Sequence, residues 1–270
     1  MILITSGTGK IGGRVSPLLQ AQGLDVKAAS RSSAPTFDWN DSKTWGEALE
    51  GVSTAMVIYY PDLAVPGAAE VVRQFATLAI EKGVPRLVLL SGRGEEGAKE
   101  AEEVVKAIAP RWTILRASWF NQNFSESFFL PFILDGDLRL PAGPVLEPFV
   151  DADDIAEVAA KVLAENGHDG QVYELTGPRL LTFSDAVEEI SRAIGRQIRF
   201  TPQTIEEFEA GLRELGVPED FIWLLNHLFA EVLDGRNASL SMDIERLLGR
   251  PARDFSDYAA QTATTNIWSA

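Results

Sequence analysis

The chain has 270 residues, 46% of them apolar, so it is long enough to bury a sizeable core in one large domain. Its formal net charge of −15 argues against nucleic acid or an anionic membrane as the main partner, because both reward clustered lysine and arginine. With no cysteine, it has no disulfide, no thiolate nucleophile and no cysteine-based zinc site.

No apolar run approaches 18 residues, and the chain begins with a strand-like run rather than a secretory signal. We therefore expect a cytoplasmic globular protein that does not span a membrane and binds a small molecule. We expect no bound metal, and the sequence neither indicates nor excludes a homo-oligomer.

Short apolar runs alternate with helix-length periodic segments through the first 117 residues. Strands are predicted at 1–6, 25–29, 54–60, 86–91 and 112–116. Helices are predicted at about 11–22, 42–49, 68–82 and 96–109. This repeated β-α pattern predicts a Rossmann-type α/β fold, a doubly wound parallel sheet with helices on both faces.

The pattern changes after residue 116. Residues 117–133 mix aromatic with polar side chains, and residues 135–150 carry the glycine and proline of a loop or hairpin. Further elements are predicted as a helix at 150–165, a strand at 171–177, a helix at 182–195, a strand at 197–202, and helix over 205–233 with a break near 216–218. Because no linker separates these parts, we expect a single domain over residues 1–270. Its interleaved C-terminal substrate lobe is formed mainly by about 118–150 and 178–270.

A glycine-rich loop joins the first predicted strand to the first predicted helix. Gly7, Gly9 and Gly12 have the G-x-G-x-x-G spacing that lets a pyrophosphate approach backbone N–H groups at a helix N-terminus. The rival interpretation, a Walker A loop, lacks its first glycine at Ile4 and its magnesium-binding Ser or Thr at Ile11. Glycines that only turn the chain are the remaining alternative.

The end of the second predicted strand indicates which dinucleotide binds. NAD-specific sites usually place Asp or Glu there, whereas a 2′-phosphate prefers arginine and hydroxyl donors. Here Arg31 is flanked by Ser30, Ser32 and Ser33, and Lys10 could add charge. An exposed arginine on a loop is the plainer alternative. We predict NADP(H) as the cofactor, with NADPH preferred over NADH.

Several motifs together resemble one family. They are "TSGTGKIGG", "AASRS", "FDWND", "LVLLSGRG", "WTILRASWFNQNFSE", "EPFVDADDIAEVA" and "VYELTGP". The chain resembles the NmrA-like atypical short-chain dehydrogenases/reductases from Leu3 to about Trp268. It looks most like the bacterial relatives of the ergot-alkaloid-type reductases, the festuclavine and agroclavine dehydrogenase group. The resemblance implies an NADP(H)-binding Rossmann fold with a small C-terminal substrate lobe.

The resemblance also implies where the cofactor lies. The pyrophosphate would meet Gly7, Thr8, Gly9, Lys10, Ile11 and Gly12. The 2′-phosphate would meet Arg31, the adenine would be bordered by Asp38 and Trp39, and the ribose would pass Tyr59, Tyr60 and Pro61. The nicotinamide would lie near Ser91, Gly92, Trp119, Phe120 and Asn123. One departure is Ser6, which stands where many relatives carry the first glycine of T-G-x-T-G-x-x-G and which we expect to reduce affinity.

The usual catalytic pair of short-chain dehydrogenases is missing. In a Tyr-x-x-x-Lys pair the lysine lowers the tyrosine's pKa for proton transfer. Here Lys99 is preceded four residues earlier by Glu95, and no tyrosine occurs between Tyr60 and Tyr173. This favours hydride transfer to a planar, electron-poor substrate that needs little proton donation, an imine or iminium ahead of a quinone.

Two residues are the catalytic candidates for orienting that substrate, Asn121 and Glu147. A non-catalytic NADP(H)-binding regulator or redox sensor is the alternative function, because NmrA-like proteins include such regulators. Asn121, Gln122 and Asn123 favour an enzyme, since a sealed aromatic core would normally exclude unpaired amides.

Three further segments have plain structural interpretations. The aspartates at 151, 153 and 154 are predicted to cap a helix rather than to bind metal. The acidic run 95–103 is predicted to be a solvated helix face. Residues 221–233 are apolar around most of a helix, which predicts burial in a core, an interface or a lid, with a core as the default.

Overall fold

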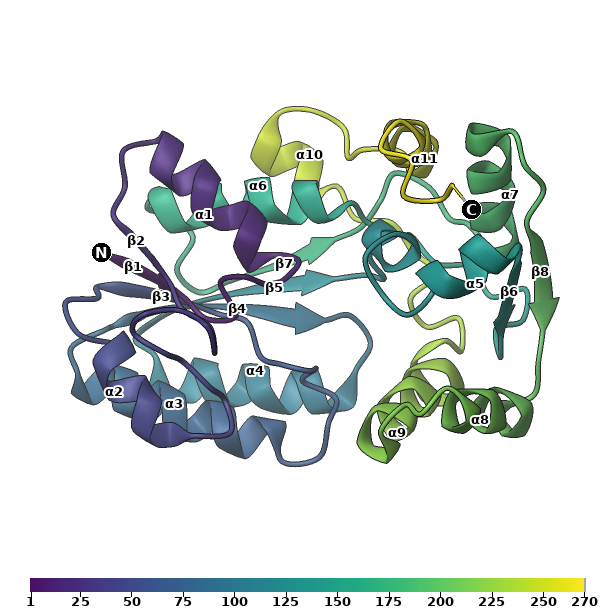
Figure 1. Cartoon of the computed structure of the whole chain (residues 1–270). Helices are drawn as coiled ribbons and strands as arrows, with labels where there is room; N and C mark the ends of the chain where they lie inside the picture. Colours follow the sequence, from purple (N-terminus) through teal and green to yellow (C-terminus); the bar gives the residue numbers. More distant parts are fainter. Residues whose placement is uncertain (270) are drawn as a thin grey trace. The chain divides into compact units, whose positions relative to one another are not determined.

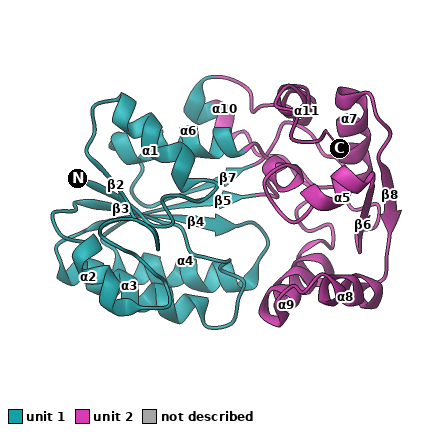
Figure 2. Cartoon of the chain, in the orientation of Figure 1, with its two compact units in different colours: residues 1–117, 152–175, 246–249 teal, residues 118–151, 176–245, 250–270 magenta. Residues whose placement is uncertain are grey.

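The structure, a computed structural model, describes residues 1–269. It divides into two compact units, coloured separately in Figure 2. Unit 1 comprises residues 1–117, 152–175 and 246–249, and unit 2 comprises residues 118–151, 176–245 and those from 250 onward. The predicted substrate lobe therefore falls within unit 2 except at residues 246–249.

Unit 1 is built on six parallel strands. They are β1 (Ile2–Ile4), β2 (Val26–Ala28), β3 (Thr54–Val57), β4 (Arg86–Gly92), β5 (Arg111–Ala117) and β7 (Gln171–Leu175). Their spatial order is β2-β1-β3-β4-β5-β7, with the pairing parallel throughout. All residues of β1 and β3 are buried, as expected for strands covered on both faces.

Helices cover both faces of this sheet (Figure 1). The helices of unit 1 are α1 (Gly12–Ala21), the 3₁₀ turn η1 (Ser42–Thr44), α2 (Trp45–Ala48), α3 (Ala68–Glu81), α4 (Glu96–Ile108) and α6 (Ala152–Ala164), and α10 (Asp243–Leu248) begins in unit 2 and ends in unit 1. Helices α1 and α6 pack on one face, and α2, α3 and α4 lie on the other. The Rossmann-type fold predicted from the β-α alternation is confirmed.

Unit 2 has a separate, aromatic-rich core. Its elements are the 3₁₀ turn η2 (Asn121–Phe124), α5 (Leu130–Asp135), β6 (Asp137–Leu140), α7 (Phe183–Ile194), β8 (Arg199–Pro202), α8 (Ile205–Glu214), α9 (Glu219–His227), a π-helix η3 (Leu228–Val232) and α11 (Phe255–Ala263). The packed rings include Phe124, Phe129, Phe149, Phe183 and Phe255.

Local sequence signals explain several of these elements. Thr182 and Thr204 each form a capping box with an acidic residue three positions later, which fixes the start of α7 and of α8. The hairpin interpretation of residues 135–150 is wrong. Strand β6 pairs in parallel with β8, about 60 residues further along the chain.

The apolar segment 221–233 contributes to the core of unit 2, as predicted. Ile222, Leu225 and Phe229 are buried in that core. Trp223 instead lies on the surface, 43% exposed, with its ring stacked on His227. No helix within residues 1–269 is both long enough and apolar enough to cross a membrane.

Candidate functional site

The glycine loop of unit 1 is held rigidly by its own close packing. The backbone N–H of Gly7 donates to the carbonyl of Ala29 over 2.8 Å, which ties the loop to the end of β2. A Cβ on Gly7 would lie 2.7 Å from the backbone of Ala28, and one on Gly12 would lie 2.5 Å from the carbonyl oxygen of Ser6. These two glycines are therefore required for the loop and α1 to pack as they do.

The other face of the loop offers a site for an anion. Thr8 and Gly9 are exposed, and α1 begins directly after the loop. Ile11, the residue before α1, makes no side-chain cap in the described structure, and the first turn carries no acidic side chain. The N–H groups of Gly9, Gly13 and Arg14 already donate to backbone carbonyls of the loop. The dipole of α1, with no acidic side chain in its first turn, still favours a phosphate at this end of the helix.

Ser6 adopts the left-handed backbone conformation that glycine favours. Its φ is +52°, and its hydroxyl donates to the carbonyl of Ile58 over 2.9 Å. The left-handed conformation costs a non-glycine residue about 1–2 kcal/mol, part of which this hydrogen bond offsets. Ser6 therefore adopts the backbone conformation expected of the glycine that it replaces in the family pattern.

Arg31 is exposed at the turn that follows β2. Its guanidinium carbon lies 5.4 Å from the centre of the Tyr60 ring. The predicted role of the neighbouring hydroxyls needs correction. Ser33 accepts from the backbone N–H of Ser30 and donates to its carbonyl, so this hydroxyl stabilises the turn rather than facing a ligand. The Ser30 side chain is itself buried.

The residues predicted around the adenine and ribose differ in how deeply they are buried. Trp39 is 5% exposed, and its indole N–H donates to Ile58 in the aromatic core. Little of that ring is open to solvent, and its place beside the adenine stays a prediction. Asp38 is half-buried, Tyr59 packs on Trp39, and Tyr60 is 53% exposed, next to Pro61.

Ser91, at the end of β4, is engaged in a buried network of charges. Its hydroxyl donates to Glu102 over 2.7 Å, and Arg116 donates to both oxygens of the same carboxylate over 2.7 and 2.6 Å. Arg116 and Arg93 also bond to Glu174. These hydrogen bonds hold the pKa of Arg116 above its usual range.

This network corrects the interpretation of the acidic run 95–103 as a solvated face. Glu102 is fully buried and Glu95 is 9% exposed. The spacing of Ala98, Ala101, Glu102 and Val105 places the glutamate on the buried face of α4, a signal that sequence reasoning missed.

Unit 2 holds the candidates for contact with the substrate. Asn121 is fully buried, and within residues 1–269 neither polar atom of its side chain has a hydrogen-bond partner. Glu147 is also fully buried, and its backbone exchanges hydrogen bonds with Leu181 over 2.8 and 2.9 Å. A buried amide without partners is costly, and such groups commonly mark a place where a ligand or water binds.

The remaining predicted nicotinamide residues in unit 2 are half-buried. Trp119 packs against Phe129, Phe183 and Phe229, with ring centres 5.2–6.5 Å apart. Phe120 forms a parallel bridge with Val150, next to Asn121. These contacts place Trp119 at the margin of the aromatic core of unit 2. Asn123 is half-buried as well.

The predicted cofactor residues of unit 1 gather at one edge of its sheet. The glycine loop follows β1, Arg31 follows β2, Tyr59 follows β3, and Gly92 ends β4. In a parallel sheet these carboxyl ends share an edge. Because the chain reverses its direction of winding between β1 and β3, ligands are expected at this point.

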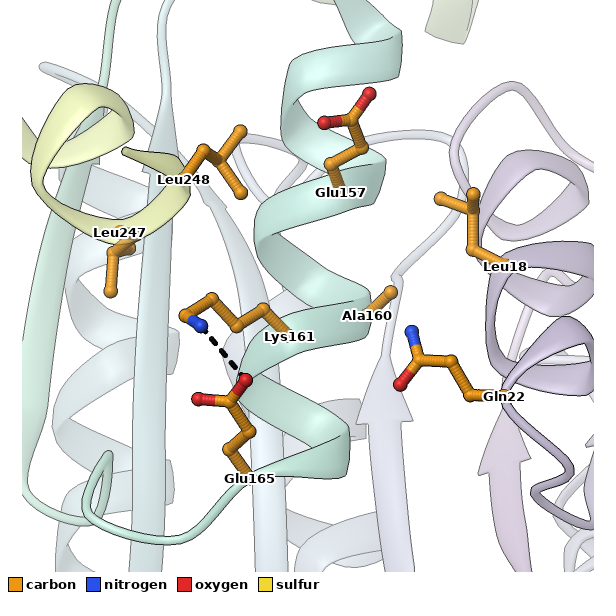
Figure 3. Close-up of a pocket in the computed structure, with 8 residues that line it drawn as sticks. All are labelled: Leu18, Gln22, Glu157, Ala160, Lys161, Glu165, Leu247 and Leu248. Atoms are coloured by element: carbon orange, nitrogen blue, oxygen red, sulfur yellow. Dashed lines mark hydrogen bonds and ion pairs between the residues drawn. The ribbon is translucent and has the colours of Figure 1, made fainter. Parts of the chain in front are cut away.

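A cavity of about 290 Å³ lies elsewhere in unit 1 (Figure 3). It is lined by Leu18, Gln22, Glu157, Ala160, Lys161, Glu165, Leu247 and Leu248. Leu18 and Gln22 belong to the far end of α1 from the glycine loop, and Lys161 bonds to Glu165 across one turn of α6. This cavity is therefore not the dinucleotide site.

The parallel sheet, the glycine loop at its first β-α turn and the uncapped helix define the class: a dinucleotide-binding Rossmann protein. No family model matches the chain. It is 32% identical to agroclavine dehydrogenase of Claviceps fusiformis, covering 99% of this chain and 98% of that protein.

Two solved structures share the fold. The NADPH complex of the quinone oxidoreductase QOR2 from Escherichia coli has a TM-score of 0.83 and 24% identity, covering 97% of this chain and 99% of that one. The transcriptional regulator NmrA in complex with NAD has a TM-score of 0.75 and 15% identity, covering 98% and 96%. The chain belongs to the NmrA-like atypical short-chain dehydrogenase/reductase family, together with the clavine dehydrogenases. It is an NAD(P)H-dependent reductase.

Proposed function

We propose that this reductase uses NADP(H), in preference to NADH, to transfer hydride to a planar, electron-poor small molecule. The observation that carries the cofactor assignment is Arg31. It is the exposed cation at the end of β2, on the same edge of the sheet as the glycine loop. A planar guanidinium binds phosphate through paired hydrogen bonds, whereas an NAD-specific site would need a carboxylate here.

The residues of unit 1 fit the cofactor. The exposed backbone at Thr8 and Gly9 and the uncapped start of α1 would hold the pyrophosphate, and Arg31 would hold the 2′-phosphate. Tyr60, which already lies against Arg31, would border the adenosine end. When bound, NADPH supplies the hydride, and the protein supplies position and a suitable electrostatic environment.

The substrate class is proposed from unit 2. The Asn121 amide offers one acceptor and two N–H donors without partners among the described residues, enough to orient a polar heteroatom. The half-buried Trp119 ring offers a flat apolar surface. Glu147 supplies a buried carboxyl group, and a cation bound beside it would favour its charged form, so the site would prefer a cationic iminium to a neutral ketone.

The relatives support a substrate of this kind. One is named for agroclavine and another for quinones. We rank an imine or iminium ahead of a quinone, because an iminium, or an imine that binds in its protonated form, needs no proton after it accepts the hydride. That ranking accommodates the missing Tyr-x-x-x-Lys pair.

Calorimetric titration with NADPH and NADH tests the cofactor assignment. We expect the wild type to bind NADPH at least about tenfold more tightly than NADH. Arg31→Ala should weaken NADPH binding about tenfold to a hundredfold, because a hydrogen bond to a charged group contributes about 1.5–3 kcal/mol. NADH binding should change little.

The control is Arg73→Ala, at an exposed arginine of α3 that bonds to Glu70. Equal affinity of the wild type for the two cofactors would refute the assignment.

A screen of NADPH oxidation tests the substrate class. Cyclic iminium ions, quinones, azo dyes and simple ketones are compared at equal concentration, each with and without enzyme. We expect iminium ions to turn over fastest, quinones next and ketones least. Turnover of ketones alone would overturn the ranking. Tight NADPH binding without oxidation of any compound would favour the non-catalytic regulator.

A further inference from the structure

Two acidic residues meet at the edge of the sheet where the cofactor site is proposed. Asp62 lies in the loop after β3, directly following Pro61, and Glu95 lies in the loop between β4 and α4. Strands β3 and β4 pair in parallel, with Val57 opposite Leu89, so both loops leave the same edge. The Asp62 loop is the one that carries Tyr59 and Tyr60.

Close contacts fasten these two loops together within unit 1. The side chain of Glu95 hydrogen-bonds to Asp62 and packs on Gly92, where any Cβ would overlap its carboxyl group. A Cβ on Gly97, in the first turn of α4, would lie 2.8 Å from the carbonyl oxygen of Leu63. The loop after β3 therefore fits against the start of α4 without room for a side chain at position 97.

A hydrogen bond between two carboxyl groups requires a proton on one of them. Glu95 is 9% exposed, and its Oε2 is buried without a hydrogen-bond partner among residues 1–269. The pKa of Glu95 is raised well above its usual value. Burial is the largest cause, and the negative charge of Asp62 and the hydrogen bond to it add to the effect. Asp62 is held in place, because it also accepts from the backbone N–H of Ala64 over 2.8 Å.

The charged residues near Glu95 in the chain also bond to other residues. Arg93, which follows β4, bonds to Glu174, and Glu96 in α4 bonds to Lys99 over 2.6 Å. Tyr59 and Tyr60 are the titratable groups of the loop after β3, and burial raises the pKa of Tyr59. The burial of Glu95 favours its protonated form.

We propose that Asp62 and Glu95 form a proton-dependent latch that holds the Tyr59–Ala64 loop against the start of α4 and so couples NADPH binding to the pair's proton. While one proton is shared, a carboxyl donates to a carboxylate and the loops stay together. When the proton leaves, the buried carboxylate of Glu95 and the half-buried carboxylate of Asp62 repel, and the loop that carries Tyr60 loses its position. The two are positioning residues.

The sign of the effect follows from the raised pKa of Glu95. A group whose pKa is raised by folding stabilises the fold fully below its unfolded-state pKa, and that contribution is lost as the pH rises through the folded pKa. The loops should therefore separate, and NADPH should bind more weakly, as the solution becomes more alkaline. This inference rests on the proposed cofactor site.

The test measures NADPH dissociation constants between about pH 7 and about pH 9.5 for the wild type and Glu95→Gln. The glutamine can still donate to Asp62 but cannot lose a proton. We expect the wild-type constant to rise about tenfold or more with pH, while that of Glu95→Gln stays within about twofold. Comparing the two variants cancels any titration of the cofactor itself. Glu96→Gln, a change at the adjacent but exposed glutamate, should behave as the wild type does.

A second measurement uses only the wild type, in case Glu95→Gln does not fold. NADPH binding is titrated calorimetrically in buffers of different ionisation enthalpy, which counts the protons taken up. Proton uptake should grow toward one per NADPH as the pH approaches the alkaline end.

The outcomes separate the latch from the cofactor site. The latch alone is overturned if NADPH binds tightly without proton uptake and its dissociation constant depends on pH in the same way in the wild type and in Glu95→Gln. Absence of NADPH binding at every pH overturns the proposed cofactor site instead. A third outcome would also overturn the latch: kcat falls in Glu95→Gln, while its NADPH dissociation constant has the same value and the same pH dependence as in the wild type. Glu95 would then act in the chemistry rather than in positioning the loop.

Discussion

Two fully buried polar side chains, Glu102 in unit 1 and Asn121 in unit 2, differ in whether the fold supplies their hydrogen-bond partners. In unit 1 the fully buried Glu102 accepts hydrogen bonds from Ser91 and Arg116, so its charge is compensated within the fold. In unit 2 the fully buried Asn121 has no such partner among the described residues. The difference teaches that Glu102 completes a scaffold, whereas Asn121 has the character of a group reserved for a ligand.

Breaking the compensated network should give the largest effect on stability. Arg116→Met removes two hydrogen bonds from Glu102 and leaves a carboxylate in the protein interior with Lys106 3.6 Å away. We expect the free energy of unfolding to fall by about 3 kcal/mol, as for other buried pairs that lose one partner. Urea denaturation followed by circular dichroism measures this change.

The matched control lies on the surface of unit 2. Arg213 bonds to Glu209 and Glu219 but is exposed, so Arg213→Met should have a far smaller effect. If the two substitutions destabilised the protein equally, the buried network would have no special role in the scaffold.

Asn121→Leu should have a smaller effect on stability, and in the opposite direction. Replacing a buried amide that lacks partners with an apolar side chain of similar size should leave the free energy of unfolding unchanged or raise it by about 1 kcal/mol. Turnover of the preferred substrate should nevertheless fall, because the orienting donors and acceptor are lost. Denaturation and steady-state kinetics on the same variant measure both.

The neighbouring amide provides the control. Gln122 donates to Asp151 over 3.2 Å, so Gln122→Leu should cost about 1 kcal/mol of stability. A loss of stability in Asn121→Leu as large as that in Gln122→Leu would mean that Asn121 has a structural partner. It would then no longer be a candidate for substrate binding.

The sequence predicts unit 1 better than unit 2 for a physical reason. In unit 1 each buried strand is a short apolar run beside an amphipathic helix, and both signals are local. In unit 2 the pairing of β6 with β8 joins residues about 60 positions apart, so nothing near Asp137 reveals it. The capping boxes at Thr182 and Thr204 are local, and the helices that they begin were predicted.

The candidate site shows the same limit. The glycine spacing and Arg31 can be recognised from sequence because the backbone itself makes the loop and the turn. Whether Trp39 faces a ligand or the core depends on Phe37 and Phe75, which pack around it. The contact between Asp62 and Glu95 likewise depends on the register of β3 with β4, which no local pattern encodes.

The smallest effect is expected at Ser6, where unit 1 departs from the family's glycine. Ser6→Gly removes the hydrogen bond to Ile58 but also removes the strain of a left-handed conformation at a non-glycine residue. Because the two effects oppose each other, the free energy of unfolding should stay within about 1 kcal/mol of that of the wild type. NADPH affinity should stay the same or rise a few-fold. Ser6→Ala loses the hydrogen bond and keeps the strain, so it should be less stable than Ser6→Gly by about 1 kcal/mol. Denaturation of both variants and an NADPH titration measure the balance. If Ser6→Gly proves as unstable as Ser6→Ala, the hydroxyl rather than the backbone conformation determines how well this loop is held.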